Sequence, residues 1–289
     1  MVKPPPTPNK PAVNPAAAPI NKYMSKVMDR TFCIESPETE QQLLSALLER
    51  HHATPQRIIC KSNTRSTNDD VRELHEQGVQ SALVISHQQS HGRGQHQREW
   101  LSPQGNIFLS ALFSLERPVD GRFALECGLN ILHTATLEKL DNLQIKWAND
   151  LYSPQGKWGG ILVEPINAHQ VIVGIGINVV PFEQSKTIQQ ATTSLNELGL
   201  THYDRIQFLA EIYLALTQAV QWFNFGSQNL AQRFNAIAAF KDQWVNIQRQ
   251  HQADLIGYFQ GIQDDGAMLI RQDADAINTV CYDGRLMIP

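Results

Sequence analysis

A short basic segment rich in glycine is the first place where the chain could do chemistry. It runs Gly92-Arg93-Gly94-Gln95-His96-Gln97-Arg98-Glu99-Trp100. Two glycines separated by one residue let the backbone approach a ligand closely. Each arginine can hold a phosphate or a carboxylate through two hydrogen bonds, and Trp100 adds a flat apolar face. The segment has neither the third glycine of a dinucleotide-binding fingerprint nor the Gly-Lys-Ser/Thr of a P-loop, so alone it is equally consistent with a basic surface hairpin.

Three further segments combine glycine or polar residues with predicted strands. Lys146-Trp147-Ala148-Asn149-Asp150 ends one strand, where an amide and a carboxylate can orient a ligand or hold a metal ion. Gly156-Lys157-Trp158-Gly159-Gly160 precedes another, and Lys157 could stabilise anionic oxygens as an acid anhydride forms. Val173-Gly174-Ile175-Gly176-Ile177-Asn178 has glycine at alternate positions, which leaves one face of the strand bare for a small molecule.

A fifth segment, Arg65-Ser66-Thr67-Asn68, offers hydroxyls and an amide at the predicted start of a helix. Taken singly, each of these segments also has a structural explanation. Asn and Asp favour tight turns, a lysine beside glycines suits a solvated hairpin, and alternate glycines allow close packing of a helix on a strand. Serine or threonine before a helix is a common N-cap.

The elements that position these segments follow from apolar periodicity, caps and turn residues. We predict helices from Ser36-Pro37 through Leu48, from Ser66 or Thr67 to Gly78, and over Arg122–Leu140, Tyr203–Phe223 and Leu230–Gln243. We predict strands at Arg57–Cys60, Ala82–Ser86, Asn106–Phe113, Leu143–Trp147, Gly160–Glu164 and Val171–Ile177. Four short strands then follow at Leu255–Gln260, Met268–Arg271, Thr279–Tyr282 and Leu286–Ile288, with turns at Asp264-Asp265-Gly266 and Asp283-Gly284, a pattern typical of a small β-barrel.

The predicted fold class is therefore α+β, a mixed β-sheet flanked by helices and followed by a small C-terminal β-barrel. We predict a disordered Pro-rich tail over residues 1–30, a catalytic domain over residues 31–242 and the small β domain over residues 243–289. The length of 289 residues is enough for one sizeable core and a small second domain.

Bulk composition excludes several classes of protein. A formal net charge of −4 gives no basic footprint for binding nucleic acid or a membrane surface. The four cysteines are scattered, which suits a reducing compartment. The sequence has no apolar run of about 18 residues, which a membrane span requires, and no secretory signal. We expect a cytoplasmic protein that binds neither nucleic acid nor membrane.

The order and spacing of the five segments resemble the biotin–protein ligases. The resemblance rests on Ser66-Thr67-Asn68, Gln89 with Gly92-Arg93-Gly94, Arg98-x-Trp100, Lys146-Trp147-x-Asn149-Asp150, Gly156-Lys157-x-x-Gly160 through Glu164, and Gly174-x-Gly176-x-Asn178. By motif the resemblance covers roughly residues 60–180, and Ile256-Gly257, Gly261-Ile262 and Asp265-Gly266-Ala267 extend it to that family's terminal SH3-like domain.

The resemblance implies a class II synthetase-like core and a two-step reaction. Biotin and MgATP would give biotinyl-5′-AMP and pyrophosphate, and biotin would then pass to a lysine of a biotin carboxyl carrier domain, such as that of acetyl-CoA carboxylase.

The resemblance also implies roles for individual residues. Biotin would be bound by Ser66, Thr67, Asn68, Gln89, Gly92, Arg93, Lys157 and Gly160. ATP and the adenylate would be bound by Arg93, Arg98, Trp100, Asn149 and Asn178. The catalytic groups would be Lys157 and Arg93, and Asp150 would help to hold Mg²⁺. Homologues are often dimers and sometimes monomers, so the sequence leaves both a homodimer and a monomer open.

The sequence departs from the family pattern inside the basic segment. Gln95, His96 and Gln97 replace basic residues and the third glycine, so the segment is less cationic and less flexible. We hypothesise that it holds the adenylate less firmly by about 1–3 kcal/mol, the scale of a lost charge-assisted hydrogen bond. Ala148 replaces the usual proline, which should relax that turn. The chain before Ser66 leaves no room for the winged helix-turn-helix of some bacterial members, so we expect no repressor activity.

Two alternatives stay open at this point. A lipoate–protein ligase or octanoyltransferase shares the core fold and parts of the Trp-x-Asn-Asp and Gly-Lys-x-x-Gly patterns, although the basic segment and the β-rich C-terminus favour biotin. A non-catalytic biotin or nucleotide sensor would be expected to lose Lys157 or Arg93, and both are present.

Overall fold

The computed structural model describes residues 34–182, 190–249, 252–272 and 278–287, so the tail predicted over residues 1–30 lies outside it. Its helices are α1 (Pro37–Arg50), α2 (Thr67–Glu76), α3 (Arg122–Leu132), α4 (Arg205–Asn224) and α5 (Leu230–Asn235), with 3₁₀ turns η1 (Gln95–Gln97) and η2 (Leu137–Lys139). Its first seven strands are β1 (Arg57–Thr64), β2 (Ala82–Gln89), β3 (Ile107–Ser114), β4 (Gln144–Lys146), β5 (Asp150–Ser153), β6 (Gly156–Pro165) and β7 (Gln170–Ile177). The last five are β8 (Trp244–Gln248), β9 (Leu255–Ile262), β10 (Met268–Arg271), β11 (Thr279–Cys281) and β12 (Arg285–Met287).

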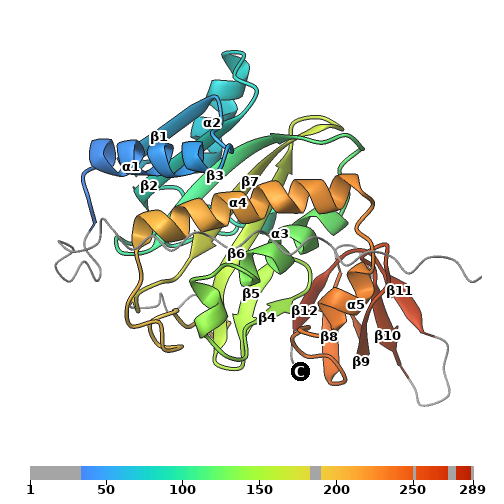
Figure 1. Ribbon diagram of the computed structural model, residues 1–289. Helices are drawn as coiled ribbons and strands as arrows, with labels where there is room; N and C mark the ends of the chain where they lie inside the picture. Colours follow the sequence, from blue (N-terminus) through green and yellow to red (C-terminus); the bar gives the residue numbers. More distant parts are fainter. Residues whose placement is uncertain (1–33, 183–189, 250–251, 273–277, 288–289) are drawn as a thin grey trace, which may run out of the picture.

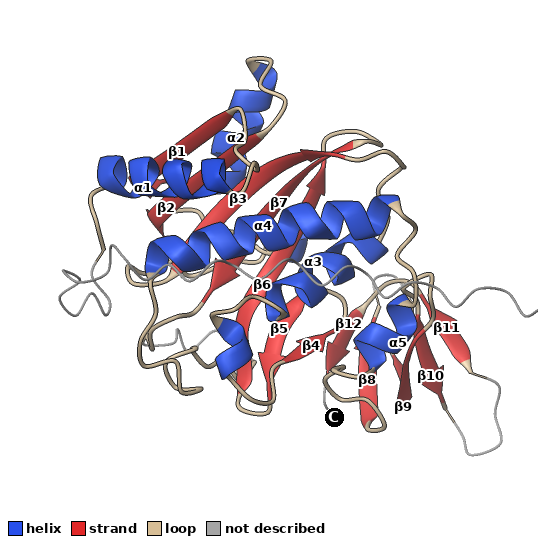
Figure 2. Cartoon of the chain, viewed as in Figure 1, coloured by secondary structure: helices blue, strands red, loops and turns tan. Residues whose placement is uncertain are grey.

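The first seven strands form one mixed sheet in the order β1-β2-β3-β7-β6-β5-β4. β1 and β2 are parallel, and every other neighbouring pair is antiparallel. Helices α1, α3 and α4 lie across one face of this sheet, and α2 packs on the opposite face (Figures 1 and 2). The predicted mixed sheet with flanking helices is confirmed.

The two faces of the sheet are packed differently because successive side chains of a strand point to opposite sides. On β7, Val173 and Ile175 join the large core under α1, α3 and α4. Gly174 and Gly176 alternate with them and face the other way, on the side of α2. A small second core beneath α2, which includes Val71 and Val84, fills only part of that face. The rest of that face, which carries Gly160, Gly174 and Gly176, holds the candidate site.

Helix α1 is fixed to the sheet by a buried charged residue as well as by apolar packing. Ser36 caps the helix by accepting a hydrogen bond from the backbone N–H of Thr39. The Glu40 carboxylate is fully buried, where it accepts from the Arg205 Nε of α4 at 2.8 Å and lies 2.8 Å from the His87 Nε2 of β2. Burial alone would raise the pKa of Glu40, but His87 and Arg205 outweigh it and hold the pKa below its usual value.

The last five strands form a separate antiparallel sheet in the order β11-β10-β9-β8-β12. A separate antiparallel sheet of five strands confirms the prediction of an SH3-like C-terminal unit. Among the described strands the sheet is open, so the prediction that it closes into a barrel is wrong. The two sheets share one continuous hydrophobic core. The Trp147 indole N–H also joins them by donating to the Gly266 carbonyl at 2.9 Å. The domain boundary at residues 242 and 243 stays a prediction.

Two predicted helices are shorter than expected, and two strands were missed. Helix α3 ends at Leu132 rather than at the predicted Leu140, because the chain turns through Thr134 and Thr136. The backbone N–H of Thr136 donates to the Glu211 carboxylate of α4. Helix α5 ends at Asn235 rather than at the predicted Gln243. The side-chain amide of Asn235 donates to the backbone carbonyl of Ile262 and accepts from its backbone N–H. The missed strands are β5 and β8, both short.

None of the helices in the described ranges is long and apolar enough to cross a membrane.

Candidate active site

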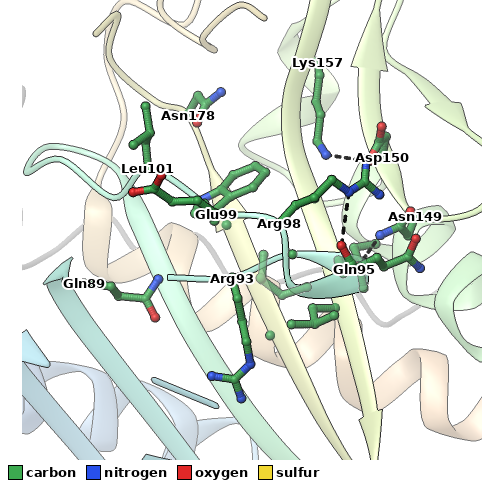
Figure 3. Close-up of a pocket in the computed structure, with 18 of the residues that line it drawn as sticks. Gln89, Arg93, Gln95, Arg98, Glu99, Leu101, Asn149, Asp150, Lys157 and Asn178 are labelled. Atoms are coloured by element: carbon green, nitrogen blue, oxygen red, sulfur yellow. Dashed lines mark hydrogen bonds and ion pairs between the residues drawn. The ribbon is translucent and has the colours of Figure 1, made fainter. Parts of the chain in front are cut away.

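A cavity of about 380 Å³ lies on the α2 side of the large sheet (Figure 3). Its volume is within the range of small-molecule sites. The residues predicted from the sequence that line it are Ser66, Thr67, Asn68, Gln89, Arg93, Arg98, Trp100, Asn149, Asp150, Lys157, Gly160 and Asn178. The fold thus brings together segments that are more than a hundred residues apart in the chain. Gly92 is the one predicted residue outside the lining, and it lies next to the Gln89 amide.

The N-terminus of α2 forms one end of the cavity. Both the backbone N–H and the hydroxyl of Thr67 donate to Gln89 Oε1, at 2.9 and 3.1 Å. The Thr67 hydroxyl also lies 2.6 Å from that of Ser110 on β3. Ser66 makes no side-chain cap to its own helix, so its hydroxyl is available to other groups. The result is a compact set of donors and acceptors that suits an uncharged polar head group.

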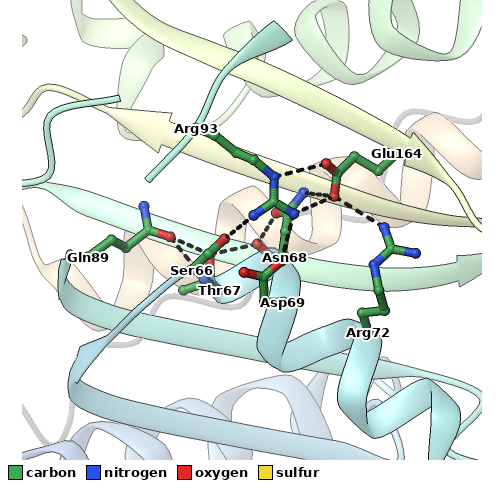
Figure 4. Close-up of polar contacts among 9 residues, drawn as sticks. Ser66, Thr67, Asn68, Asp69, Arg72, Gln89, Arg93 and Glu164 are labelled. Carbon is green, nitrogen blue, oxygen red and sulfur yellow. Dashed lines mark hydrogen bonds and ion pairs between the residues drawn. The ribbon is translucent and has the colours of Figure 1, made fainter. Parts of the chain in front are cut away.

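Arg93 is held among carboxylates at the same end of the cavity (Figure 4). Its Nε and Nη2 donate to the two oxygens of Glu164, both at 3.1 Å, and Nη2 lies 2.8 Å from Asp69. Its Nη1 donates to the Ser66 hydroxyl at 3.1 Å. Asn68 adds a further donor to Glu164 at 2.9 Å. An anionic ligand would therefore compete with Glu164 and Asp69 for this guanidinium.

The ionisation of Glu164 follows from the same contacts. Partial burial opposes its charged form, but the hydrogen bonds from Arg93 and Asn68 outweigh this and keep the pKa of Glu164 below its usual value. The carboxylate is thus charged at neutral pH and neutralises Arg93.

The basic segment is folded as a hairpin over the cavity. Gly94 N–H donates to the Arg98 carbonyl at 2.7 Å, and Trp100 N–H donates to the Gly92 carbonyl at 2.9 Å. Between them η1 makes the turn, with His96 and Gln97 at φ of 55° and 57°. That left-handed conformation is the one glycine adopts without cost. The departures from the family pattern therefore fall on the residues that form the turn itself.

Trp100 lies against the glycines of the sheet. A Cβ atom at Gly176 would come within 2.6 Å of the indole, and one at Gly160 within 3.3 Å. The indole also lies 5.0 Å from the Lys157 ammonium, in a cation–π contact. Its N–H is buried and has no hydrogen-bond partner in the described structure. The bare strand face predicted for a small molecule is thus covered in this state by an aromatic ring.

Asp150 and Lys157 form a charged corner of the cavity, and Lys146, which is not part of the lining, pairs with Asp150. Lys157 Nζ lies 2.6 Å from Asp150 Oδ1, and Lys146 Nζ lies 3.6 Å from Asp150 Oδ2. Burial lowers the pKa of Lys146 to about 8, against the attraction of Asp150. Burial would raise the pKa of Asp150, but Lys157 and Lys146 prevail and lower it. One carboxylate thus lies between two basic side chains in this corner.

The two predicted amide residues are bonded to backbone. Asn149 Nδ2 donates to the Ile161 carbonyl at 2.6 Å, and Asn178 Nδ2 donates to the Thr193 carbonyl at 3.2 Å. These bonds fix strand ends and also hold both amides at the cavity wall. Their predicted contact with a nucleotide stays a prediction.

Several side chains of the site were not predicted. Glu164 and Lys146 lay inside the quoted motifs, and they pair with two residues of the cavity lining, Arg93 and Asp150 respectively. Asp69 lies in the first turn of the predicted helix. Arg285 gave no signal, because it reaches the cavity from the C-terminal sheet.

The described residues contain no group of three or more His, Cys, Asp or Glu side chains that could hold a metal ion. Asp150 is a single carboxylate, and such a group binds Mg²⁺ together with the phosphates of a substrate. Its predicted part in Mg²⁺ binding stays a prediction.

Comparison with known proteins relates this fold and site to one family. The family model for the biotin/lipoate A/B protein ligases matches residues 58–178. The biotin–[acetyl-CoA-carboxylase] ligase of Paracoccus denitrificans is 30% identical over 243 residues, which cover 79% of this chain and 96% of that protein. The bifunctional ligase/repressor BirA of Salmonella typhimurium is 33% identical over 201 residues, 66% of this chain. The match spans 62% of the length of that protein.

Solved structures show the same fold. The biotin protein ligase of Aquifex aeolicus, in complex with biotin and ATP, superposes with a TM-score of 0.67 at 22% identity, over 80% of this chain and 98% of that one. The Leishmania major enzyme, in complex with biotinyl-5-AMP, gives 0.54 at 20% identity, over 79% and 100%. This chain belongs to the biotin protein ligase family, as its motifs predicted.

Proposed function

We propose that the protein activates biotin with ATP and transfers it to a lysine of a biotin carboxyl carrier domain. The observation that carries the proposal is a cavity in which a polar end, lined by Ser66, Thr67 and Gln89, and a charged corner flank a floor of glycines. The polar end suits the uncharged head group of biotin, and the charged corner suits the reacting phosphate. The relatives are biotin ligases, among them one with biotin and ATP bound.

In the first step a carboxylate oxygen of biotin attacks the α-phosphorus of ATP. A new P–O bond forms, the bond to the β-phosphate breaks, and pyrophosphate leaves with its electrons. Both reactants are anions, so cations are needed to offset their repulsion. Lys157 would supply charge at the reacting phosphate, and Arg93 would turn from Glu164 and Asp69 to the biotin carboxylate. Mg²⁺ would enter with ATP as part of the substrate.

In the second step the amine of the carrier lysine attacks the carbonyl carbon of the adenylate. The C–N bond forms, the C–O bond to phosphate breaks, AMP leaves and the amine gives up a proton. The mixed anhydride is labile to water, so it must be covered. The hairpin of Gly92–Trp100 lies where such a cover is needed.

The remaining predicted roles are part of this proposal. Ser66, Thr67, Asn68 and Gln89 would hold the head group of biotin, together with the backbone at Gly160. Arg98, Trp100, Asn149 and Asn178 would hold the nucleotide. A homodimer and a cytoplasmic location stay predictions.

Incubation of a carrier domain with the protein, biotin and MgATP tests the proposal, with mass spectrometry as the readout. We expect a gain of one biotinyl group on one lysine, and pyrophosphate release that depends on biotin. Release driven by lipoate or octanoate instead would support the related acyl ligases, and biotin binding without release would support a sensor. The Lys157→Met variant should lose release, whereas Lys241→Met, which removes a half-buried lysine that is paired with Asp242 and lies outside the cavity lining, should retain it.

A further inference from the structure

A buried asparagine joins two segments of the cavity wall without lining the cavity itself. Asn106 directly precedes β3 and is buried. Its Oδ1 accepts from the backbone N–H groups of Val179 and Val180, at 2.7 and 3.0 Å. Its Nδ2 donates to the Pro103 carbonyl at 3.4 Å. One side-chain amide thus ties the chain that leaves the hairpin to the chain that leaves β7.

The two segments that Asn106 joins both carry cavity residues. Trp100 and Leu101 belong to the chain that leaves the hairpin. Asn178 and Phe182 lie on either side of the two N–H groups that Asn106 binds. Figure 3 shows Asn178 and Leu101 together, apart from Asp150. The width of this part of the cavity therefore depends on how the two segments are held against each other.

The ladder of the sheet ends before this point. β3 and β7 pair as far as Ile107 and Ile177, and Asn106 continues the connection beyond that last pair. Val179 is fully buried, and a buried backbone N–H needs an acceptor. The segments also touch, because a Cβ atom at Gly105 would lie 2.7 Å from the Val180 side chain. The amide of Asn106 thus does the work of a further ladder bond.

Asn106 is itself held from the helical side of the sheet. Arg205 Nη1 donates to the Asn106 carbonyl at 3.0 Å, and Arg205 Nε donates to the fully buried Glu40 at 2.8 Å. The backbone at Asn106 cannot shift without disturbing this buried ion pair, and breaking such a pair is costly. Asn106 is therefore a fixed point to which both segments are bonded.

We propose that Asn106 is a positioning residue for the nucleobase of ATP. It sets the separation between the segment of Trp100 and Leu101 and the segment of Asn178 and Phe182, so that a planar ring fits between them. Binding groups must be held to within about 0.5 Å of their productive geometry, and a buried amide with fixed partners can do this. The inference rests on the proposed use of ATP, and it gives a part in binding to a residue that touches no ligand.

Calorimetric titration of the full chain with AMP, inorganic tripolyphosphate and biotin tests this role without turnover. We expect Asn106→Ala to weaken AMP binding by roughly 10-fold, the effect of losing a hydrogen bond. Binding of tripolyphosphate and of biotin should not change. Asn106→Asp keeps an acceptor for both N–H groups and should recover most of the AMP affinity. If Asn106→Ala does not fold, Asn106→Ser takes its place, because its hydroxyl is too short to reach either N–H group.

Asn235→Ala is the matched control. The Asn235 amide also bonds two backbone groups, both of Ile262, and lies outside the cavity lining. This variant should lose stability without losing AMP affinity. In an active enzyme, Asn106→Ala should raise the KM for ATP by roughly 10-fold and change kcat by less than about twofold, whereas Asn235→Ala should change neither.

The outcomes separate this inference from the proposed function. AMP binding that depends on Asn106, in a protein without biotin-dependent pyrophosphate release, would refute the biotin reaction and support the positioning role. Normal release together with unchanged AMP affinity in Asn106→Ala would refute the positioning role alone. The role is also refuted if wild type does not bind AMP, if tripolyphosphate binding falls as much as AMP binding, if Asn106→Asp recovers nothing, or if Asn235→Ala loses as much AMP affinity.

Discussion

Removal of the Asp150 carboxylate should change how the protein's stability depends on pH. In Asp150→Asn, Lys146 loses the carboxylate that lies 3.6 Å from it, the one acidic partner it has within the described ranges, and the lysine side chain is just 6% exposed. Two unit charges about 4 Å apart attract by about 4 kcal/mol in an effective dielectric of about 20. A loss of that size lowers the proton affinity of the lysine by roughly 10³-fold. Because its pKa is about 8 with Asp150 present, Lys146 should become neutral at neutral pH in the variant.

The sign of the effect follows from proton linkage. A lysine whose pKa is lower in the folded than in the unfolded state makes the protein more stable as pH rises between the two values. In wild type this rise begins near the folded pKa of about 8, so Lys146 contributes little slope below it. In Asp150→Asn the same rise begins below neutrality. Between about pH 6 and pH 8 its free energy of unfolding should therefore gain up to about 1.4 kcal/mol per pH unit relative to wild type.

Urea unfolding of both proteins at several pH values across this range measures the difference. The double variant Asp150→Asn/Lys146→Met is the control, since it lacks the titrating lysine and should lose the extra slope. Equal slopes for wild type and Asp150→Asn would refute the assignment of a counter-charge role to Asp150. Stability is the better readout than activity here, because Asp150 also lines the cavity.

Three further changes test other parts of the structure. Gln95→Arg restores a cation to the hairpin and should slow dissociation of the acyl adenylate by roughly 10- to 100-fold, as a trapped-product chase would show; an unchanged rate would contradict the hypothesis. Glu40→Gln breaks a fully buried ion pair with Arg205 and should lower the free energy of unfolding by about 3–5 kcal/mol in urea titrations, whereas a loss below about 1 kcal/mol would show that the pair is dispensable. Gly176→Ala places a methyl group 2.6 Å from the Trp100 indole and should raise the KM for ATP several-fold, which kinetics at saturating biotin would measure; an unaltered KM would place the indole away from the nucleotide.

Local patterns in the sequence predicted most of the large sheet and its helices, because apolar alternation and helix caps act over a few residues. The strand that became β7 was predicted almost to the residue, since glycines and β-branched residues alternate along it. The helix predicted through Gln243 failed because Asn235 bonds to Ile262, a partner 27 residues away. Hydrogen bonds between residues far apart in the sequence do not change the local periodicity of apolar residues, so they cannot be predicted from it.

The site was predicted in the same uneven way. Residues within motifs, such as Arg93 and Lys157, were found and line one cavity. The pairing of Arg93 with Glu164 could not be read from either segment, since it depends on where β6 passes the hairpin. Arg285 was missed for a related reason, as it belongs to another sheet.

The unequal packing of the two faces of the large sheet has a consequence for how this family can diversify. Residues such as Val173 and Ile175 carry the stability of the fold, while Gly174 and Gly176, which alternate with them, contribute little to it and face the cavity. A substitution on the core side of β7 thus acts mainly on the stability of the fold, and a substitution on the cavity side acts mainly on ligand binding. Because the two sides are separate, ligand specificity can change during evolution without a large loss of stability.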